Sequence, residues 1–182
     1  MRVSYPPLGE YAAQAARQEM LDRGFALVKT PRCVANCSSA RLNGSVTLRS
    51  LTRDCRFPAL TRYGLWAESL IRNALPEEYV CLTALELRHE AASHTDKQID
   101  RLHADGSYIR SVFTLHGPST IYRAGKTQRS VPFGTTIFMT AIGRARTIGV
   151  PCTLHRRPGR RMERTVIVCS FKPRSFAGSG VA

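Results

Sequence analysis

A chain of 182 residues has room for one domain with a buried core, and a composition of 43% hydrophobic and 22% charged residues is unlike that of a disordered chain. The start of the chain lacks the apolar core of a secretory signal and no run has the length of a membrane span, so we expect a cytoplasmic protein with free thiols at its six cysteines. The net charge of +14 lies mainly in the second half of the chain, which has 14 Lys and Arg but only two acidic residues from residue 101 onward. A positive field of this kind attracts anions, including carboxylates and nucleic acid.

Two helices are expected in the N-terminal part. The segment from Leu8 to Arg23 repeats apolar residues at helical spacing, and Gly24 follows it at the position of a C-terminal cap. The segment from Pro58 to Ala74 has a broad apolar face that includes Trp66, and Pro76 blocks its continuation. We expect both helices to support a sheet.

The segment between these helices begins with a short expected strand, Phe25 to Val28. From Arg32 to Phe57 no period is sustained, which predicts a long loop with a short hairpin around Asn43-Gly44. A loop of this length beside a site often contacts substrate.

After Pro76 the sequence consists of short β-type runs separated by turn residues. The expected strands are Tyr79 to Leu87, Tyr108 to Leu115, Ser119 to Arg123, Thr135 to Thr140, Arg146 to Leu154 and Arg164 to Phe171. Several strands after two helices predict an α+β domain whose β part is a two-sheet sandwich or jelly roll.

One set of polar residues has the spacing of a metal site. His103 and Asp105 are two residues apart in an expected extended segment, so both side chains point to the same face. His155 follows 52 residues later, and Arg164 opens an apolar strand nine residues beyond it. Two imidazoles and one carboxylate on one face of an ion leave three positions open, a ligand set that suits non-haem iron(II), and an arginine fork binds a carboxylate.

This pattern resembles the 2-oxoglutarate/Fe(II) oxygenase superfamily, which carries His-x-Asp, then His after about fifty or more residues, then Arg or Lys on the next strand. The resemblance covers roughly residues 79–172 and includes the runs Leu115 to Arg123 and Val131 to Phe138. It implies one oxygenase domain over residues 1–182, with a helical N-terminal support over about 1–78 and a double-stranded β-helix (jelly-roll) core over about 79–172.

The resemblance also implies a chemistry. Fe(II) would be held by His103, Asp105 and His155, and 2-oxoglutarate by Arg164, although Arg160 and Arg161 lie in the same basic run. With O2, the co-substrate would be decarboxylated to succinate while the substrate is hydroxylated, desaturated or cyclised.

Members with an Arg-x-Ser motif carry a hydroxyl two residues after the arginine, where this chain has Val166. Thr120 or Tyr122 is therefore expected to be the second residue that binds the co-substrate.

The substrate is less defined by the sequence. Arg110 alternates with Tyr108 and Val112, so it either points into the barrel, where it would bind a substrate carboxylate, or outward to solvent. An oxygenase acting on a small anionic or amino-acid-like molecule is the first hypothesis. A nucleic-acid demethylase is the second, although that family carries an arginine where this chain has Ser170, and a non-catalytic cupin-like or nucleic-acid-binding domain is the third.

Overall fold

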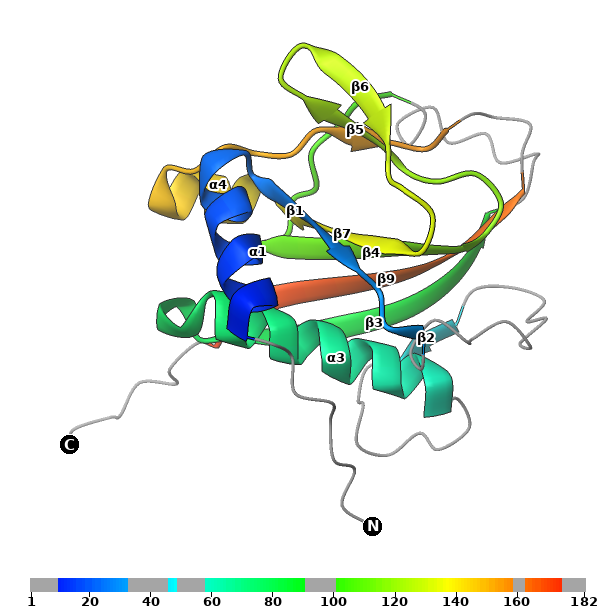
Figure 1. The fold of residues 1–182 in the computed structure, drawn as a ribbon, viewed down its shortest axis with the longest axis horizontal. Coiled ribbons are helices and arrows are strands. Elements are labelled where there is room, and N and C mark those ends of the chain that lie inside the picture. The colour runs from blue at the N-terminus through cyan, green and yellow to red at the C-terminus, as the bar shows by residue number, and fades with distance from the viewer. Residues whose placement is uncertain (1–9, 33–45, 49–57, 91–100, 159–162, 175–182) are drawn as a thin grey trace.

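The computed structural model describes residues 10–32, 46–48, 58–90, 101–158 and 163–174 (Figure 1). In this part of the chain the helices are α1 (Glu10–Asp22), the 3-10 helix η1 (Pro76–Glu78), α3 (Pro58–Ala74) and α4 (Ile142–Ile148). The strands are β1 (Phe25–Lys29), β2 (Val46–Leu48), β3 (Val80–Glu90), β4 (Ile109–His116), β5 (Ile121–Ala124), β6 (Thr127–Ser130), β7 (Thr135–Thr140), β8 (His155–Arg156) and β9 (Arg164–Pro173).

Two antiparallel sheets form the body of the molecule. The larger sheet has the strand order β1-β7-β4-β9-β3-β2, and the smaller sheet has the order β6-β5-β8. In Figure 1 the smaller sheet lies on one side of the larger sheet and α3 lies along its other side. The chain is thus an α+β fold with two facing sheets and N-terminal helices.

Helix α3 covers the outer face of the larger sheet. It begins at Pro58, whose fixed φ suits the first turn, and its apolar face is buried against strand residues such as Phe113 and Phe138. The ring of Tyr63 stacks on Phe113 with centroids 5.7 Å apart, and Trp66 lies 6.0 Å from Phe138. Trp66 is therefore a core residue, as the sequence predicted.

The inner face of the larger sheet looks toward the smaller sheet. Side chains alternate along β4 and β9, so Ile109 and Phe113 join the outer core with the helices while Val112, Val166 and Val168 join a second apolar cluster between the sheets. Two charged residues of these same strands, Arg110 and Arg164, line a pocket together with the three valines. The sheet therefore supplies an apolar floor with a cation toward each end.

One expected strand is wrong. The run from Arg146 to Leu154 begins inside α4, which ends where Gly149 adopts a left-handed conformation with φ of 72°. Only His155 and Arg156, just beyond that run, form a strand, β8. The polar strand β6 was not expected, because its four residues are all exposed and show no apolar alternation. Both differences arise because the neighbouring elements, and not the local pattern, decide the structure there.

The other expected elements lie close to their predicted positions. Helix α3 has the predicted bounds, and α1 and β1 differ from prediction by a residue or two among described residues. The expected hairpin at Asn43-Gly44 and most of the Arg32 to Phe57 loop lie outside the described residues. Within the described ranges, no helix is both long and apolar enough to cross a membrane.

Candidate metal centre and pocket

The backbones of residues 103 and 155 are hydrogen-bonded to each other. His103 N–H donates to the carbonyl of His155 and His155 N–H donates to the carbonyl of His103, each at 2.9 Å. This isolated antiparallel bridge lies at the start of β8 and brings together residues that are distant in sequence. Their imidazole rings lie with centroids 4.5 Å apart. The smaller sheet thus fixes the distance between the two histidines.

Asp105 completes a group of three metal-ligating side chains. One ligand atom from each of His103, Asp105 and His155 lies within 4.8 Å of the others. Nδ1 of His103 donates to the carbonyl of Arg101 at 2.9 Å, and this bond favours the tautomer in which Nε2 is the nitrogen that can bind a metal. The structure therefore brings together the three residues that the sequence singled out.

The two carboxylate oxygens of Asp105 have different surroundings. Oδ1 accepts a hydrogen bond from Nη1 of Arg110 at 2.6 Å. Oδ2 is buried, has no hydrogen-bond donor among the described residues and lies 3.4 Å from Nε2 of His155. A buried carboxylate oxygen without a partner is costly, and a cation between it and two imidazoles would satisfy it. The donor set therefore fits a divalent metal ion such as Fe(II).

Burial determines the protonation state of His155. It lowers the pKa of His155 to about 4, and the nearby positive charges of Arg110 and Arg164 act in the same direction against the opposing effect of Asp105. The ring is therefore neutral near pH 7. A histidine binds a metal ion through its neutral imidazole, so His155 does not have to lose a proton before an ion binds.

The segment that carries Asp105 is held by the first turn of α4. The N–H groups of Ala141, Ile142 and Gly143 donate to the carbonyls of Tyr108, Asp105 and Ser107 at 3.1, 2.9 and 3.0 Å, respectively. A Cβ on Gly143 would lie 2.8 Å from the carbonyl oxygen of Ser107. Only glycine permits this close approach. The start of α4 thus holds the backbone from Asp105 to Tyr108.

Arg164 lies at the other end of the pocket and is buried. Its Nε donates to Oε2 of Glu90 at 2.6 Å, and its Nη1 donates to the hydroxyl of Thr120 at 3.1 Å. Glu90 lies directly opposite Arg164 in the β3–β9 register. A second buried arginine, Arg157, has its Nε 3.7 Å from the same Oε2 of Glu90. This end of the pocket is therefore a cluster of two guanidinium groups, one carboxylate and one hydroxyl.

A pocket of about 510 Å³ connects the metal-ligating group to this cluster. Val112, Val166 and Val168 form its apolar floor, and it is lined by the six arginines Arg88, Arg101, Arg110, Arg156, Arg157 and Arg164 and by the acids Glu90 and Asp105. The lining is strongly cationic. It is suited to anions that extend from the three metal-ligating residues toward Arg164.

The remaining residues proposed from sequence are placed as follows. Thr120 contacts Arg164, whereas the ring of Tyr122 packs on Phe25 with centroids 4.8 Å apart and is not among the residues that line this pocket. Arg110 lines the pocket but contacts Asp105. Arg160 and Arg161 lie outside the described residues.

Sequence reasoning missed Glu90 and Arg157. Arg157 lies two residues after the expected ligand His155, but only the register of β3 against β9 shows that Glu90 is opposite Arg164. The strand gives no clear signal for Glu90, because Glu86, Arg88 and His89 are polar residues of the same strand.

Comparisons with known proteins bear on the fold. No protein-family model matches the chain, and none of the curated proteins matches it by sequence. Solved structures do match it. A full-length Neurospora crassa protein in complex with alpha-KG aligns with a TM-score of 0.64 and 13% identity, over 91% of this chain and 79% of that chain. A Pseudomonas putida prolyl-4-hydroxylase aligns with a TM-score of 0.60 and 11% identity, over 89% of this chain and 99% of that chain.

The chain has the double-stranded β-helix fold of the 2-oxoglutarate/Fe(II) oxygenases. A third match agrees: dioxygenase for auxin oxidation 1 from Arabidopsis thaliana, in a binary complex with 2-oxoglutarate, aligns with a TM-score of 0.53 and 10% identity, over 88% of this chain and 87% of that chain. The expected jelly-roll core is therefore confirmed, and in this double-stranded β-helix the His103, Asp105 and His155 side chains meet between the two sheets.

Proposed function

We propose that the protein is an Fe(II)- and 2-oxoglutarate-dependent oxygenase that uses O2 to oxidise a small anionic or amino-acid-like substrate. The observation that carries this proposal is the convergence of His103, Asp105 and His155 within 4.8 Å at one end of a pocket whose other end holds a buried arginine. The fold shared with solved 2-oxoglutarate complexes supports it. We also propose that residues 1–182 form a single oxygenase domain, which stays a prediction.

Each proposed role follows from a contact. His103, Asp105 and His155 would hold Fe(II), which when bound supplies the means of activating O2 and oxidising the keto acid. Arg164 would bind the carboxylate of 2-oxoglutarate that is remote from the keto group, and the hydroxyl of Thr120, 3.1 Å from Arg164 Nη1, would be the second anchor. The three valines of the floor exclude water along the keto acid.

The cationic lining supports an anionic substrate. Arg110 Nη1 is bound to Asp105, but the Arg110 side chain is 21% exposed and lines the pocket next to the metal-ligating group. We therefore propose that a substrate carboxylate or phosphate binds the accessible part of this guanidinium and presents its reactive carbon to the iron.

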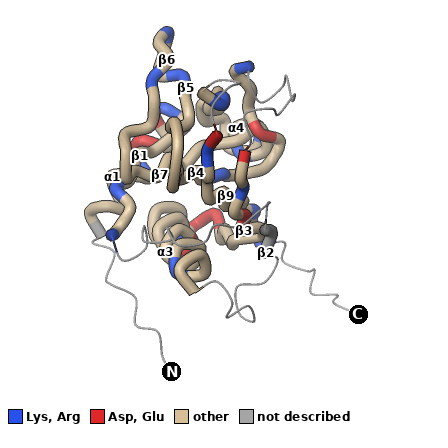
Figure 2. Tube along the Cα trace, turned by 90° about the vertical axis from the view of Figure 1, so that its right-hand side faces the viewer, with Lys and Arg blue, Asp and Glu red and all other residues tan. Residues whose placement is uncertain are grey.

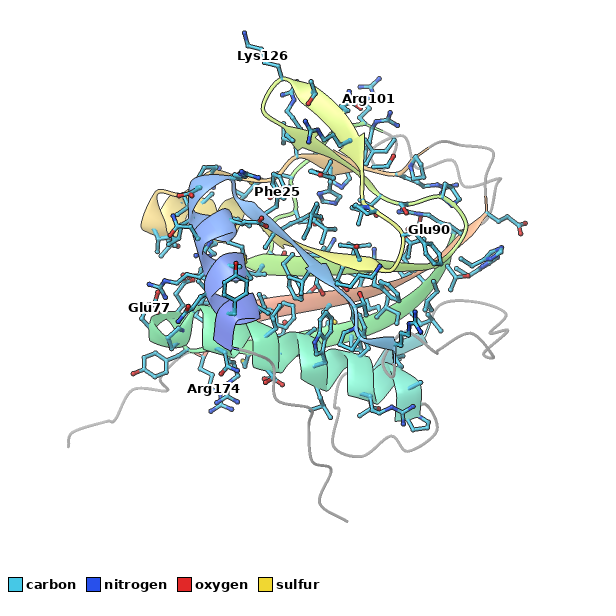
Figure 3. All side chains as sticks on the ribbon, viewed as in Figure 1. Phe25, Glu77, Glu90, Arg101, Lys126 and Arg174 are labelled. Carbon is cyan, nitrogen blue, oxygen red and sulfur yellow. The ribbon has the colours of Figure 1, made fainter. Side chains whose placement is uncertain are left out.

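A nucleic-acid substrate is the second candidate, and one observation favours it. The sequence has no acidic residue between Asp105 and Glu163, and the β5–β6 hairpin carries the exposed cations Arg123, Lys126 and Arg129. Figure 2 shows this basic hairpin, and Figure 3 labels Lys126 at its tip. Salt-sensitive binding of single-stranded DNA would support this candidate.

The proposal is tested by succinate release and iron content in four variants. His103→Ala and Asp105→Ala should lose both iron binding and 2-oxoglutarate turnover, because each removes a metal ligand. Arg164→Ala should retain iron and raise the 2-oxoglutarate concentration needed for half-maximal turnover by about tenfold or more, because it removes a charge-assisted hydrogen bond.

The matched control is His89→Ala. This exposed histidine lies on β3, where its Nδ1 is 3.3 Å from the Thr165 hydroxyl, and it is not among the residues that line the pocket. It should retain iron and turnover. Equal iron occupancy in the control and in the His103 and Asp105 variants would contradict the proposal.

A further inference from the structure

Another pocket, of about 670 Å³, lies between α1 and the β5–β6 hairpin. Its apolar surface comes from Phe25 and Leu27 of β1 and from Tyr122 and Ala124 of β5. Figure 3 labels Phe25, and it labels Lys126 at the tip of the hairpin. This pocket shares no lining residue with the pocket at the metal-ligating group, so it is a separate cavity that the proposed oxygenase reaction does not use.

Acidic and basic side chains reach this pocket from different elements. Glu19 and Asp22 are three residues apart on α1, so they project from the same side of the helix. Arg129 comes from β6, and Arg23 follows the last residue of α1. Among the described residues Arg129 forms no ion pair, although both carboxylates line the same pocket. The formal charges of the lining therefore sum to zero, but the charge of Arg129 is not neutralised by contact.

Tyr122 brings an unpartnered hydroxyl to the same pocket. Its side chain is 4% exposed and its ring packs on Phe25 with centroids 4.8 Å apart, yet its hydroxyl forms no hydrogen bond with the described residues. A tyrosine that is buried to this degree usually finds a partner for its hydroxyl. The lining thus holds a polar group that a ligand would satisfy.

The carboxylate of Glu19 is fixed beside the apolar surface of this pocket. Its Oε2 accepts a hydrogen bond from the backbone N–H of Leu27 at 3.2 Å, which ties the side chain to the strand that carries Phe25. Oε1 has no partner in the described part of the chain. One oxygen therefore holds the carboxylate in position while the other is available to a cationic group.

We propose that this pocket binds a zwitterionic amino acid with an apolar side chain. Its ammonium group contacts Glu19, its carboxylate contacts Arg129, and its side chain packs on the apolar surface. The two carboxylates of α1 would repel a polyanion, so the pocket does not suit nucleic acid, which the cations of the hairpin alone would attract. The inference is independent of the proposed function, because none of these residues belongs to the metal-ligating group or to the Arg164 cluster.

The test measures by calorimetry how the full chain, without iron or 2-oxoglutarate, binds three related ligands. L-Phenylalanine carries both charges, 3-phenylpropionate lacks the ammonium group, and 2-phenylethylamine lacks the carboxylate. L-Phenylalanine should bind most tightly. Each of the other two should bind more weakly by about fivefold or more, because one charged group of the lining is then left without its partner.

Charge-removing variants assign each contact. Glu19→Gln keeps an oxygen that can accept the Leu27 N–H, and it should weaken L-phenylalanine and 2-phenylethylamine while leaving 3-phenylpropionate unchanged. Arg129→Gln should weaken L-phenylalanine and 3-phenylpropionate alone, and because this residue is exposed the variant tests the proposal even if Glu19→Gln fails to fold. Tyr122→Phe removes only the hydroxyl and should weaken L-phenylalanine. The control Lys126→Gln removes an equal charge from the same hairpin, outside the pocket lining, and should leave all three affinities unchanged.

Two kinds of result would overturn the proposal. One is the absence of saturable L-phenylalanine binding to the wild type, or equal affinity for the three ligands. The other is binding that neither Glu19→Gln nor Arg129→Gln alters, because the ligand would then lie elsewhere in the molecule. Neither result bears on the metal centre, which succinate release and iron content test separately.

Discussion

Arg110 holds the only carboxylate among the three proposed metal ligands. Its Nη1 donates to Oδ1 of Asp105 at 2.6 Å, and this leaves Oδ2 directed toward His155. Groups that hydrogen-bond to a ligating carboxylate fix its orientation and tune its affinity for the ion. We therefore propose that Arg110 positions Asp105 for metal binding, in addition to its proposed contact with substrate.

We expect Arg110→Met to raise the dissociation constant for Fe(II) by about 10- to 100-fold, because Asp105 loses the bond that orients it. Anaerobic metal titration measures this. Arg146→Met is the matched control, since Arg146 is an exposed cation on α4 and removing it changes the net charge equally. Equal iron affinity in the two variants would show that Arg110 does not position Asp105.

The elements that hold the site explain which residues could be predicted from sequence. His103 and Asp105 are two residues apart, so their shared face follows from local extended geometry, and His155 was found by its distance along the chain. Glu90 and Arg164 are 74 residues apart and meet only through the register of β3 against β9, which no local pattern encodes.

Helix α4 was missed for a different reason. Thr147, Ile148 and Val150 are residues typical of strands, but the chain must turn after β7, and Gly149 ends a short helix there. Tertiary contacts with residues 105–108 decide this conformation.

The close packing of α4 on the segment that carries Asp105 predicts an effect of Gly143→Ala. Alanine normally stabilises a helix by about 1 kcal/mol relative to glycine, but here its Cβ would lie 2.8 Å from the Ser107 carbonyl oxygen and the backbone must move. We expect a net loss of about 1–3 kcal/mol in the free energy of unfolding and weaker iron binding. Denaturant unfolding and metal titration measure the two effects.

Gly106→Ala is the control in the same segment, because a Cβ there meets nothing within 4 Å. It should have little effect on stability. If the Gly143 and Gly106 variants were equally stable, the close approach of α4 would not matter for the fold.

At the scale of the whole molecule, a buried ion pair joins α4 to the end of the α3 layer. Arg144 is fully buried, and it donates to Glu78 through Nε at 2.9 Å and Nη2 at 2.7 Å and to the Thr140 hydroxyl through Nη1 at 2.9 Å. Tyr108 also donates to Glu78, and burial with this bond raises the pKa of Tyr108 to about 12. The network connects the helical layer to the strand that carries Arg110.

Arg144→Met should lower the free energy of unfolding by about 3–5 kcal/mol, because it leaves the buried carboxylate of Glu78 without its cation. Arg17→Met breaks the pair between Arg17 and Glu77, whose side chains are 40% and 50% exposed, and should cost less than about 1 kcal/mol. Denaturant unfolding of both variants measures the difference. Similar losses would mean that burial does not distinguish the two pairs.

The proposed activity depends on one ion and one keto acid binding together between the two sheets. The most direct measurement is an anaerobic titration of the wild-type protein with Fe(II) and then 2-oxoglutarate, followed by visible absorption. We predict a metal-to-ligand charge-transfer band that appears only when both are present and that saturates at one equivalent of each. Absence of that band, with iron bound or unbound, would contradict the proposed activity.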